Sequence, residues 1–441
     1  MLDNIKSKYI IEEIFEKIKN KRKLNIIKYN KRMLLRLNIR GKDFGVFLIL
    51  KEFNQIYHKN IEDIDIKQLN LKNAHLGNKG LKHLATINFK ELITLDLSYN
   101  EISDINILDK LNFEILKELN LSENKISNIN ILEKVNFIKL NTLDLSRNEI
   151  SNINILGKVN FKELITLDLS CNIISDINIL EKVNFIKLNT LDLSSNNISD
   201  INVLEKANLK ELNLLDLNSN RISDINVLEK VNFTKLKKLI LAYNEISDIN
   251  ILEKVNFKEL NLLDLDGNNI SDISILGKVD FKELNELNLI YNKISDISIL
   301  EKVNFKELNN IDLTFNRIFE INILEKVNFK KLKELCLSKN KISDINILEK
   351  IDLKELITLD LSDNEISDIN ILGKVNCEKL KKLILNGNKI SDISILAKVD
   401  FKELECLCIS QNKINTDKNY SLLFNLNSKI KYFFSDVKFL G

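Results

Sequence analysis

The stretch NEISDINILEKVNFKELNLLDLDG, from Asn244 to Gly267, decides the fold of this chain, because close copies of it follow one another without a gap on both sides. Its first asparagine recurs in one register over fourteen units. The positions are Asn100, Asn124, Asn148, Asn172, Asn196, Asn220, Asn244, Asn268, Asn292, Asn316, Asn340, Asn364, Asn388 and Asn412. One unbroken period indicates a single solenoid, rather than the roughly three domains that the length of 441 residues would suggest.

Each unit contains the pattern of one strand and one outer turn. Leu263-Asp264-Leu265 alternates apolar and polar residues just before the asparagine, which predicts a short half-buried strand, parallel to that of the next unit. The Ser-Asp pair before Ile249 is a predicted N-cap, so a short helix or 3-10 turn is expected on the outer side. The residues predicted to line the interior are Ile246, Ile249, Leu252, Val255, Phe257 and Leu260. Stacking of units then supplies the core.

The recurring asparagines are predicted to form a structural ladder. A side-chain amide offers two donors and an acceptor. At the turn after each strand it can satisfy backbone groups of its own unit and of the neighbouring unit that would otherwise be buried without a partner.

The composition fits an intracellular globular protein. There is no proline and only 10 glycines, so flexible hinges are few, and 44% hydrophobic with 29% charged residues allows a large core under a solvated surface. The start, MLDNIKSKYIIEEIF, does not resemble a secretory signal, and no apolar run approaches the roughly 18 residues of a membrane span. Five cysteines without a metal or redox spacing favour a reducing compartment, in the cytoplasm or the nucleus.

The sequence resembles the leucine-rich repeat family. The family's LxxLxLxxNxI core is met by Leu92, Leu95, Leu97, Asn100 and Ile102. The Ile-Ser-Asp-Ile continuation is similar to the subtype of bacterial internalins and of the leucine-rich regulator of protein phosphatase 1, although two extra residues lengthen each unit here. The resemblance implies an α/β solenoid: a horseshoe with a concave parallel β-sheet, short helices or 3-10 turns on the convex side, and a helical N-terminal cap.

Three segments are predicted. Residues 61–415 form the solenoid, with an atypical first unit in which Ala74 replaces the ladder asparagine, and residues 416–441 form an apolar C-terminal cap. Residues 1–60 form a helical module that is basic over residues 1–40, with 12 Lys plus Arg against 4 Asp plus Glu. This module resembles an F-box only weakly, because the usual Leu-Pro opening and a late Trp are absent. Two alternatives are a simple cap over the first strand and a nuclear-localisation or nucleic-acid signal formed by Lys17, Lys19, Lys21, Arg22 and Lys23.

The sequence supplies little catalytic chemistry. The three histidines, His58, His75 and His83, have no nearby cysteine and no nucleophile motif beside them. Cys406 and Cys408 alternate on one predicted strand and are expected to be structural. We therefore predict no catalytic, cofactor-binding or metal site, and no enzyme activity; a hydrolase using the acidic strand residues is the disfavoured alternative.

An acidic column precedes the asparagine ladder. Stacked strands lie about 4.8 Å apart, so neighbouring carboxylates would repel one another unless a partner or cations compensate them. The column favours a basic partner over nucleic acid, and a solvated face copied by duplication is the alternative. Its members are Asp96, Asp144, Asp168, Asp192, Asp216, Asp264, Asp312 and Asp360.

The departures from the copied unit predict a binding site. Three of the eight tyrosines, Tyr99, Tyr243 and Tyr291, fall in the column just before the asparagine, which also holds Phe315. In leucine-rich repeats this column faces the concave side, and exposed aromatic residues near an arginine are typical of protein hot spots. Drift on a tolerant surface is the alternative. The predicted partner-binding residues are Ile240, Tyr243, Asp264, Asp266, Ile290, Tyr291, Asp312, Phe315 and Arg317.

These observations predict a non-enzymatic scaffold that binds a protein with a basic surface on its concave face, rather than a small-molecule substrate or nucleic acid. Two narrower roles are alternatives that the resemblance implies: an F-box-type substrate adaptor of a ubiquitin ligase, and a phosphatase-regulatory-like subunit.

Overall fold

The computed structural model describes residues 41–61, 65–87, 89, 91–111, 113–303, 308–327, 331–399 and 402–436. The chain divides into two compact units, residues 1–188 (unit 1) and residues 189–441 (unit 2). The helical pattern predicted over residues 1–40, and with it the F-box-like segment, lies outside the described residues. The predicted boundaries at residues 60 and 415 stay a prediction.

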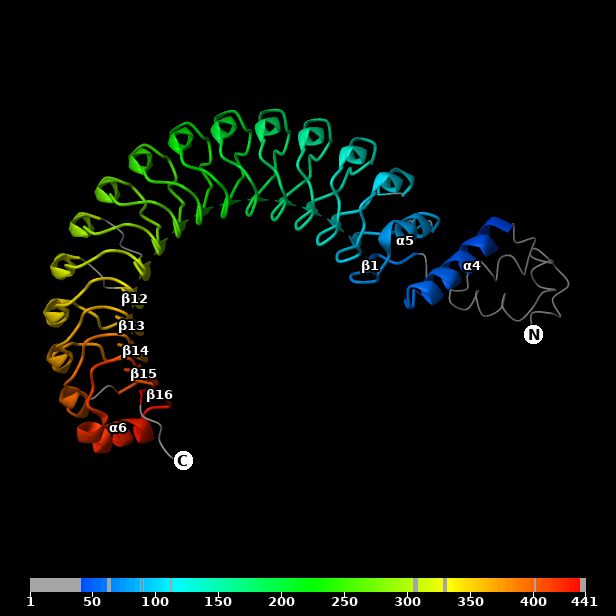
Figure 1. The fold of residues 1–441 in the computed structure, drawn as a ribbon. Helices are drawn as coiled ribbons and strands as arrows, with labels where there is room; N and C mark the ends of the chain where they lie inside the picture. Colours follow the sequence, from blue (N-terminus) through cyan, green and yellow to red (C-terminus); the bar gives the residue numbers. More distant parts are fainter. Residues whose placement is uncertain are drawn as a thin grey trace. The chain divides into compact units, whose positions relative to one another are not determined.

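Both units are built from three-residue strands that pair in parallel and in chain order (Figure 1). In unit 1 the strands are β1 (Gln68–Asn70), β2 (Thr94–Asp96), β3 (Glu118–Asn120), β4 (Thr142–Asp144) and β5 (Thr166–Asp168). In unit 2 they are β6 (Thr190–Asp192), β7 (Leu214–Asp216), β8 (Lys238–Ile240), β9 (Leu262–Asp264), β10 (Glu286–Asn288), β11 (Asn310–Asp312), β12 (Glu334–Cys336), β13 (Thr358–Asp360), β14 (Lys382–Ile384), β15 (Cys406–Cys408) and β16 (Tyr432–Phe434). The register follows the period, as in Leu239 opposite Leu263.

After the first repeat, the outer segments that the structure describes are 3-10 helices rather than α-helices. Unit 1 has η2 (Asn106–Lys110), η3 (Asn130–Glu133), η4 (Asn154–Gly157) and η5 (Asn178–Glu181). Unit 2 has η6 (Asn202–Glu205), η7 (Asn226–Glu229), η8 (Asn250–Glu253), η9 (Ser274–Gly277), η10 (Ser298–Glu301), η11 (Asn322–Lys326), η12 (Asn346–Lys350), η13 (Asn370–Gly373) and η14 (Ser394–Ala397). Within each unit the strands lie on the inner side of the curve and the 3-10 helices on the outer side (Figure 1). The predicted α/β solenoid is confirmed.

The capping residue differs slightly from the prediction. The residue at the N-cap of η8 is Ile249, whose side chain makes no capping bond. Asp248 lies one position earlier and accepts a hydrogen bond from the Asn250 N–H at 2.8 Å. The aspartate therefore closes the turn that leads into the 3-10 helix.

The core of each unit consists of aligned apolar columns. Five of the six predicted interior positions of the quoted stretch, from Ile246 to Leu260, are buried. Val255 is only half-buried, while Ile251, which the interior pattern did not include, is buried. The 3-10 helix turns Ile251 inward together with Leu252.

The first repeat of unit 1 departs from the others. Its register to the next strand is longer than the period of the later units, with Gln68 opposite Thr94, and its outer segment is an α-helix, α5 (Gly77–Leu84). Helix α4 (Gly41–Ile56) contributes the fully buried Phe53, whose ring lies 5.4 Å from that of His83.

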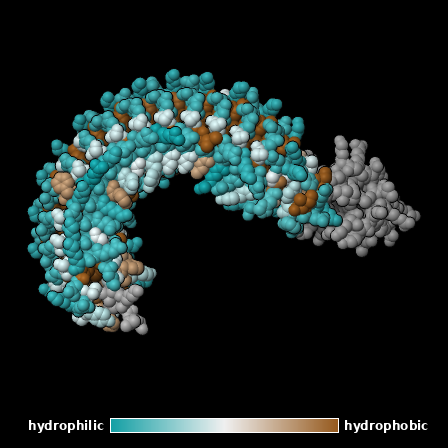
Figure 2. Space-filling view, in the orientation of Figure 1, coloured by the Kyte–Doolittle hydropathy of each residue, from teal (hydrophilic) through white to brown (hydrophobic). Residues whose placement is uncertain are grey.

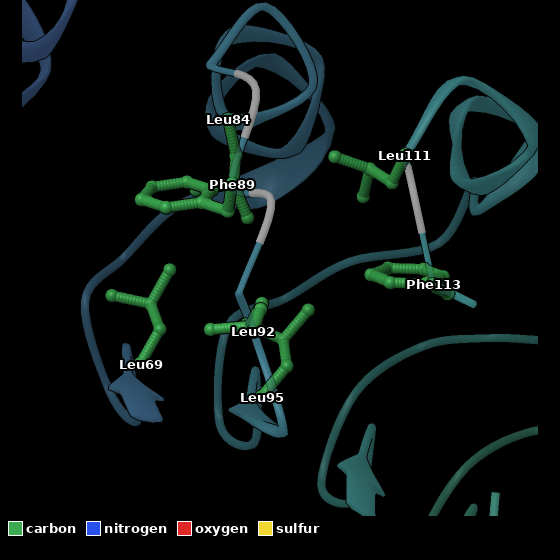
Figure 3. Close-up of a pocket in the computed structure, with 7 residues that line it drawn as sticks. All are labelled: Leu69, Leu84, Phe89, Leu92, Leu95, Leu111 and Phe113. Carbon is green, nitrogen blue, oxygen red and sulfur yellow. The ribbon is translucent and has the colours of Figure 1, made fainter. Parts of the chain in front are cut away.

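A small apolar cavity accompanies this change of register in unit 1 (Figure 3). Its volume is about 10 Å³, and Leu69 and Leu95 line it together with Phe89 and Phe113. Such a space is about the size of one water molecule and offers no polar partner, so it is a packing defect rather than a ligand site.

Unit 2 ends with helix α6 (Thr416–Lys429) and strand β16, which pairs with β15. Leu423 and Leu426 of the helix are buried, whereas Tyr420 and Phe424 are exposed. The aromatic residues of this segment therefore contribute less to the core than their apolar character predicts.

Candidate functional site

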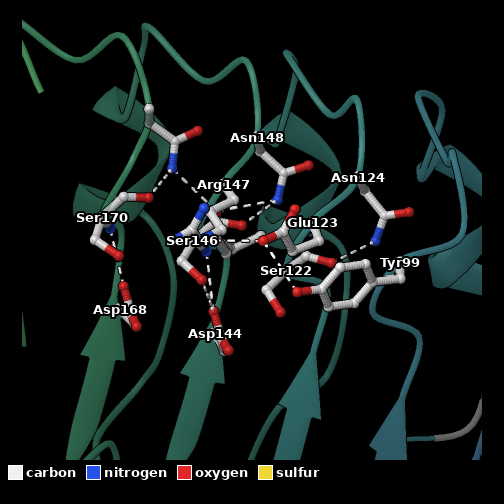
Figure 4. A network of polar contacts seen from close by, with 12 residues as sticks. Tyr99, Ser122, Glu123, Asn124, Asp144, Ser146, Arg147, Asn148, Asp168 and Ser170 are labelled. Atoms are coloured by element: carbon white, nitrogen blue, oxygen red, sulfur yellow. Dashed lines mark hydrogen bonds and ion pairs between the residues drawn. The ribbon is translucent and has the colours of Figure 1, made fainter. Parts of the chain in front are cut away.

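The ladder asparagines hydrogen-bond backbone groups of two consecutive repeats. Asn268 donates from Nδ2 to the carbonyl oxygens of Leu241 at 2.9 Å and Leu265 at 3.1 Å, and its Oδ1 accepts from the Ile246 N–H at 3.0 Å. Figure 4 shows Asn124 and Asn148 in unit 1, which donate from Nδ2 to the carbonyl oxygens of Ser122 and Ser146. All fourteen except the last, Asn412, are buried.

The acidic column has local hydrogen bonds that its sequence pattern does not reveal. Asp144 accepts from the Ser146 N–H at 2.9 Å and from the Ser146 hydroxyl at 2.7 Å (Figure 4). The N–H two residues further on also binds Asp96, Asp168, Asp192, Asp216, Asp264, Asp312 and Asp360. These carboxylates close the turn after the strand, so a structural role accounts for much of the column.

The column just before the ladder has a left-handed backbone throughout. Tyr243 has φ 49° and Tyr291 has φ 52°, and the backbone N–H of Tyr291 donates to the carbonyl of Thr314 at 2.9 Å. The turn points these side chains out of the core: Tyr243 is 55% exposed, Tyr291 56% and Phe315 42%. Most of the surface visible in Figure 2 is hydrophilic, and the hydrophobic residues on it form separate spots.

In unit 2 the structure brings together most of the predicted binding residues. The rings of Tyr291 and Phe315 lie 4.7 Å apart, and the nearby Asp266 carboxylate raises the pKa of the Tyr243 hydroxyl. Burial raises the pKa of Asp264, Asp266 and Asp312. We call Tyr243, Asp264, Asp266, Tyr291, Asp312 and Phe315 the aromatic-acidic patch.

Three predicted binding residues, Ile240, Ile290 and Arg317, are not members of this patch. Ile240 and Ile290 are half-buried, and the Ile290 carbonyl accepts a bond from the Gly267 N–H at 2.9 Å. Arg317 follows the ladder turn with an exposed side chain, and its N–H donates to the Ile294 carbonyl at 2.8 Å.

Tyr99 belongs to a separate cluster in unit 1. Its hydroxyl donates to Glu123 at 3.1 Å, and Arg147 lies 3.1 Å from the same carboxylate oxygen (Figure 4). Lys72 lies 4.9 Å from the centre of the Tyr99 ring. The cation and the acid that complement this tyrosine are therefore supplied by the chain itself.

Two residues of the patch were missed by sequence reasoning. Gly267 lies under the Tyr243 ring, and a Cβ atom there would come within 2.7 Å of that ring. The sequence does contain a signal for Gly267, because a glycine stands there in the column just before the ladder, one repeat after Tyr243. Lys339 lies 4.5 Å from the centre of the Phe315 ring, two strands from Tyr291.

A second departure from the copied unit borders a cavity of about 320 Å³ on the flank of unit 2. Phe319 and Glu320 replace the usual Ser-Asp pair there, and Asp296 and Ser298 line the opposite wall. Phe319 is exposed. The broken Ser-Asp copy could have identified this position.

The nucleophile candidates are not activated. Burial, together with the negative charges of Asp312 and Asp360, raises the pKa of the Cys336 thiol to about 12. Burial and the neighbouring Cys406, whose sulfur lies 3.8 Å away, raise the pKa of Cys408 to about 12. Among the described residues no group of three or more His, Cys, Asp or Glu side chains could hold a metal ion.

Three-residue parallel strands, a buried asparagine at every turn and 3-10 helices on the opposite side define a repeat solenoid. Family models of leucine-rich repeats match residues 330–374, described as two copies, and residues 186–201 and 376–397. The repeats are therefore leucine-rich repeats, and the chain is a leucine-rich repeat protein, as its resemblance implied. No curated protein sequence matches the chain.

Solved structures share the fold. An internalin from Listeria monocytogenes is 27% identical, with a TM-score of 0.63 over 80% of this chain and 96% of that chain. A leucine-rich repeat protein from Leptospira interrogans is 22% identical, with a TM-score of 0.67 over 89% of this chain and 98% of that chain. The plant peptide hormone receptor RGFR1, solved in complex with RGF2, is 21% identical, with a TM-score of 0.56 over 75% of this chain and 53% of that chain. Within the described part of the chain, no helix is long and apolar enough to cross a membrane.

Proposed function

We propose that this protein is a non-enzymatic scaffold that binds another protein through the aromatic-acidic patch on the strand side of unit 2. The observation that carries the proposal is the contact between Tyr291 and Phe315, whose rings lie 4.7 Å apart although both side chains are exposed to solvent. Aromatic side chains that lose little conformational freedom on binding are the residues that protein interfaces use as anchors.

The size and charge of the patch favour a protein segment as the ligand. The patch extends over four successive repeats, and strands about 4.8 Å apart give it a length of roughly 15 Å. Asp264, Asp266 and Asp312 would repel the phosphates of a nucleic acid. A partner with a basic surface complements them, and its approach is accelerated by the opposite charge.

The comparisons are compatible with a binding role. The plant receptor of the same fold was solved in complex with RGF2. A second protein of this fold, TLR13, was solved in complex with ssRNA13. TLR13 is 22% identical, with a TM-score of 0.59 over 81% of this chain and 55% of that chain. The five free cysteines support our proposal of a reducing, intracellular location. No described contact favours the F-box adaptor or the phosphatase-regulatory role, and both stay predictions.

A photocrosslinking experiment tests the proposal. A benzophenone amino acid replaces Tyr291 in the full chain, and crosslinked proteins from native extract are identified by mass spectrometry. The matched control carries the same group at Tyr420, a tyrosine of unit 2 that is 50% exposed but lies on α6. We expect a protein crosslinked specifically at position 291, whose capture the triple change of Tyr243, Tyr291 and Phe315 to Ala abolishes.

Two results would count against the proposal. Equal crosslinking at both positions would show that position 291 is not specific, and full capture by the triple variant would show that the aromatic side chains do not bind. Circular dichroism of each variant ensures that the solenoid is folded. A parallel deletion of residues 1–40 tests the adaptor role. That role predicts that ubiquitin-ligase components are lost from the captured proteins in the deletion variant and are retained in the triple alanine variant.

A further inference from the structure

Two buried side-chain oxygens among the described residues of unit 2 have no hydrogen-bond partner, Oδ1 of Asn310 and Oδ1 of Asp266, and only the Asp266 group carries a charge. At the equivalent position of other repeats a serine hydroxyl donates to the preceding acidic residue, at 2.7 Å from Ser98 to Asp96 and at 2.6 Å from Ser362 to Asp360. Asp266 removes that donor and places a second carboxylate beside Asp264. Repeat duplication alone would have supplied a serine here.

The Asp266 carboxylate is nearly enclosed and incompletely bonded. The residue is only 8% exposed, and its Oδ1 has no hydrogen-bond partner among the described residues. The Tyr243 hydroxyl and the Gly267 N–H approach the carboxylate. On either side in the same column lie Ala242 and Ile290, which offer no polar side chain. A buried polar atom without a partner is rare in folded proteins and calls for a ligand or another explanation.

No cation of the described chain compensates this charge. No lysine or arginine of the described residues forms an ion pair with Asp264, Asp266 or Asp312, in contrast to Glu123, which pairs with Arg147. Likewise, within the described ranges no lysine or arginine lies over the Tyr243 or Tyr291 ring, although Lys72 lies over Tyr99. The Tyr243 and Tyr291 rings thus lack the cation that Tyr99 has in unit 1, and the described lysine beside the patch, Lys339, lies over Phe315 instead.

The exposed Tyr243 side chain lies next to Asp266. The Tyr243 ring lies over Gly267, where any Cβ atom would approach it within 2.7 Å, and the ring is itself 55% exposed. Its hydroxyl lies close enough to the Asp266 carboxylate for that carboxylate to raise the pKa of Tyr243. Tyr291, two repeats further along the same column, packs its ring on Phe315.

The ligand that fits is an organic cation rather than a metal ion. The described side chains include no cluster of three metal-ligating groups, so these aspartates do not converge on one point. A guanidinium group can bind a carboxylate with two parallel hydrogen bonds and stack on aromatic rings, which an ammonium group does less well. We propose that an arginine side chain of the partner protein binds Asp266 and stacks between Tyr243 and Tyr291. This inference rests on the proposed function of the patch.

Selection from a library of random linear peptides displayed on phage tests the inference. The full chain is the bait, and peptides are retained whose binding is lost when Tyr291 and Phe315 are changed to Ala. Each is then synthesised with arginine, with lysine and with the neutral analogue citrulline. Affinities are measured for wild type, for Asp266→Asn and Asp266→Ser, and for the control Asp192→Asn. The control removes one carboxylate from the acidic column of unit 2 but keeps the oxygen that closes the turn, as Asn288 does naturally.

We expect the selected peptides to share an arginine. Citrulline and either Asp266 variant should each weaken binding by about tenfold or more, as the loss of a charge-assisted hydrogen bond does, while Asp192→Asn leaves it within about twofold. Unchanged affinity with citrulline or with Asp266→Asn, or equal affinity for lysine, would overturn the arginine assignment and leave the proposed function intact. If no peptide depends on Tyr291 and Phe315, both proposals fail.

Discussion

Replacing Asp266 by the serine of the other repeats should stabilise unit 2. In Asp266→Ser the new hydroxyl can donate to Asp264 as Ser146 donates to Asp144 at 2.7 Å, and a hydrogen bond to a charged group contributes about 1.5 to 3 kcal/mol. The change removes the interaction between the Tyr243 hydroxyl and the Asp266 carboxylate, which costs about 0.5 to 1 kcal/mol because that ring is exposed and the hydroxyl returns to water. We expect a net gain of about 0.5 to 2.5 kcal/mol at pH 7.

The gain should depend on pH with a defined sign. Burial raises the pKa of Asp266 in the folded protein above its unfolded value of about 3.9, so wild type loses stability as the pH rises through the folded pKa. The advantage of Asp266→Ser is therefore largest at pH 7 and shrinks as the pH falls toward about 4. Asp264 and Asp312 also have raised pKa values, and both are present in wild type and variant.

Urea unfolding followed by circular dichroism measures this difference, and hydrogen exchange of the β9 amides locates it, since long repeat arrays need not unfold in one step. Asp192→Asn is the control, and it should leave the free energy of unfolding unchanged within about 0.5 kcal/mol. If Asp266→Ser is no more stable than wild type at pH 7, Asp266 is already satisfied and our account of it is wrong. A stability difference that is the same at pH 7 and pH 4.5 would contradict the role of its charge.

Three further predictions concern the ladder, the Tyr243 ring and the thiols. Asn268→Leu leaves several buried backbone groups without partners and should lower stability by at least about 3 kcal/mol, measured by urea unfolding; an unchanged midpoint would refute the ladder. Gly267→Ser should displace the Tyr243 ring, because a Cβ would lie 2.7 Å from it, and nuclear magnetic resonance of the ring protons should then show greater exposure than in wild type. Cys336 and Cys408, with pKa values of about 12, should resist iodoacetamide at pH 8, where about 10⁻⁴ of each thiol is ionised, and react when urea is added.

The sequence predicted those parts of the fold that repeat. Leu263-Asp264-Leu265 identified a strand because alternation has a single interpretation when it recurs in every unit, and the ladder position followed from the same period. The longer register between Gln68 and Thr94 was not predicted, because only one unit has it and α5 replaces a 3-10 helix there.

The candidate site was predicted only as a set of positions. Departures from the copy identified Tyr243 and Asp266, but not that the Tyr243 hydroxyl contacts Asp266 or that Gly267 makes room for the ring. These contacts join side chains of two successive repeats, in directions that depend on the left-handed turn before each asparagine. A pattern of residue types contains no information on those directions.

Because the column before the ladder has a left-handed backbone in every repeat, the anchor side chains are separated by a whole number of repeats. Every position of this column in unit 2, from Ser195 to Gln411, has φ between 49° and 66°, whichever residue occupies it. Each repeat therefore presents one interchangeable side chain in the same orientation. Insertion of one whole copy of the unit between Tyr243 and Tyr291 would separate them by about 4.8 Å more and leave every core contact in place. Adding or removing whole repeats between the anchors can thus adapt the molecule to a longer or shorter ligand without changes to its core.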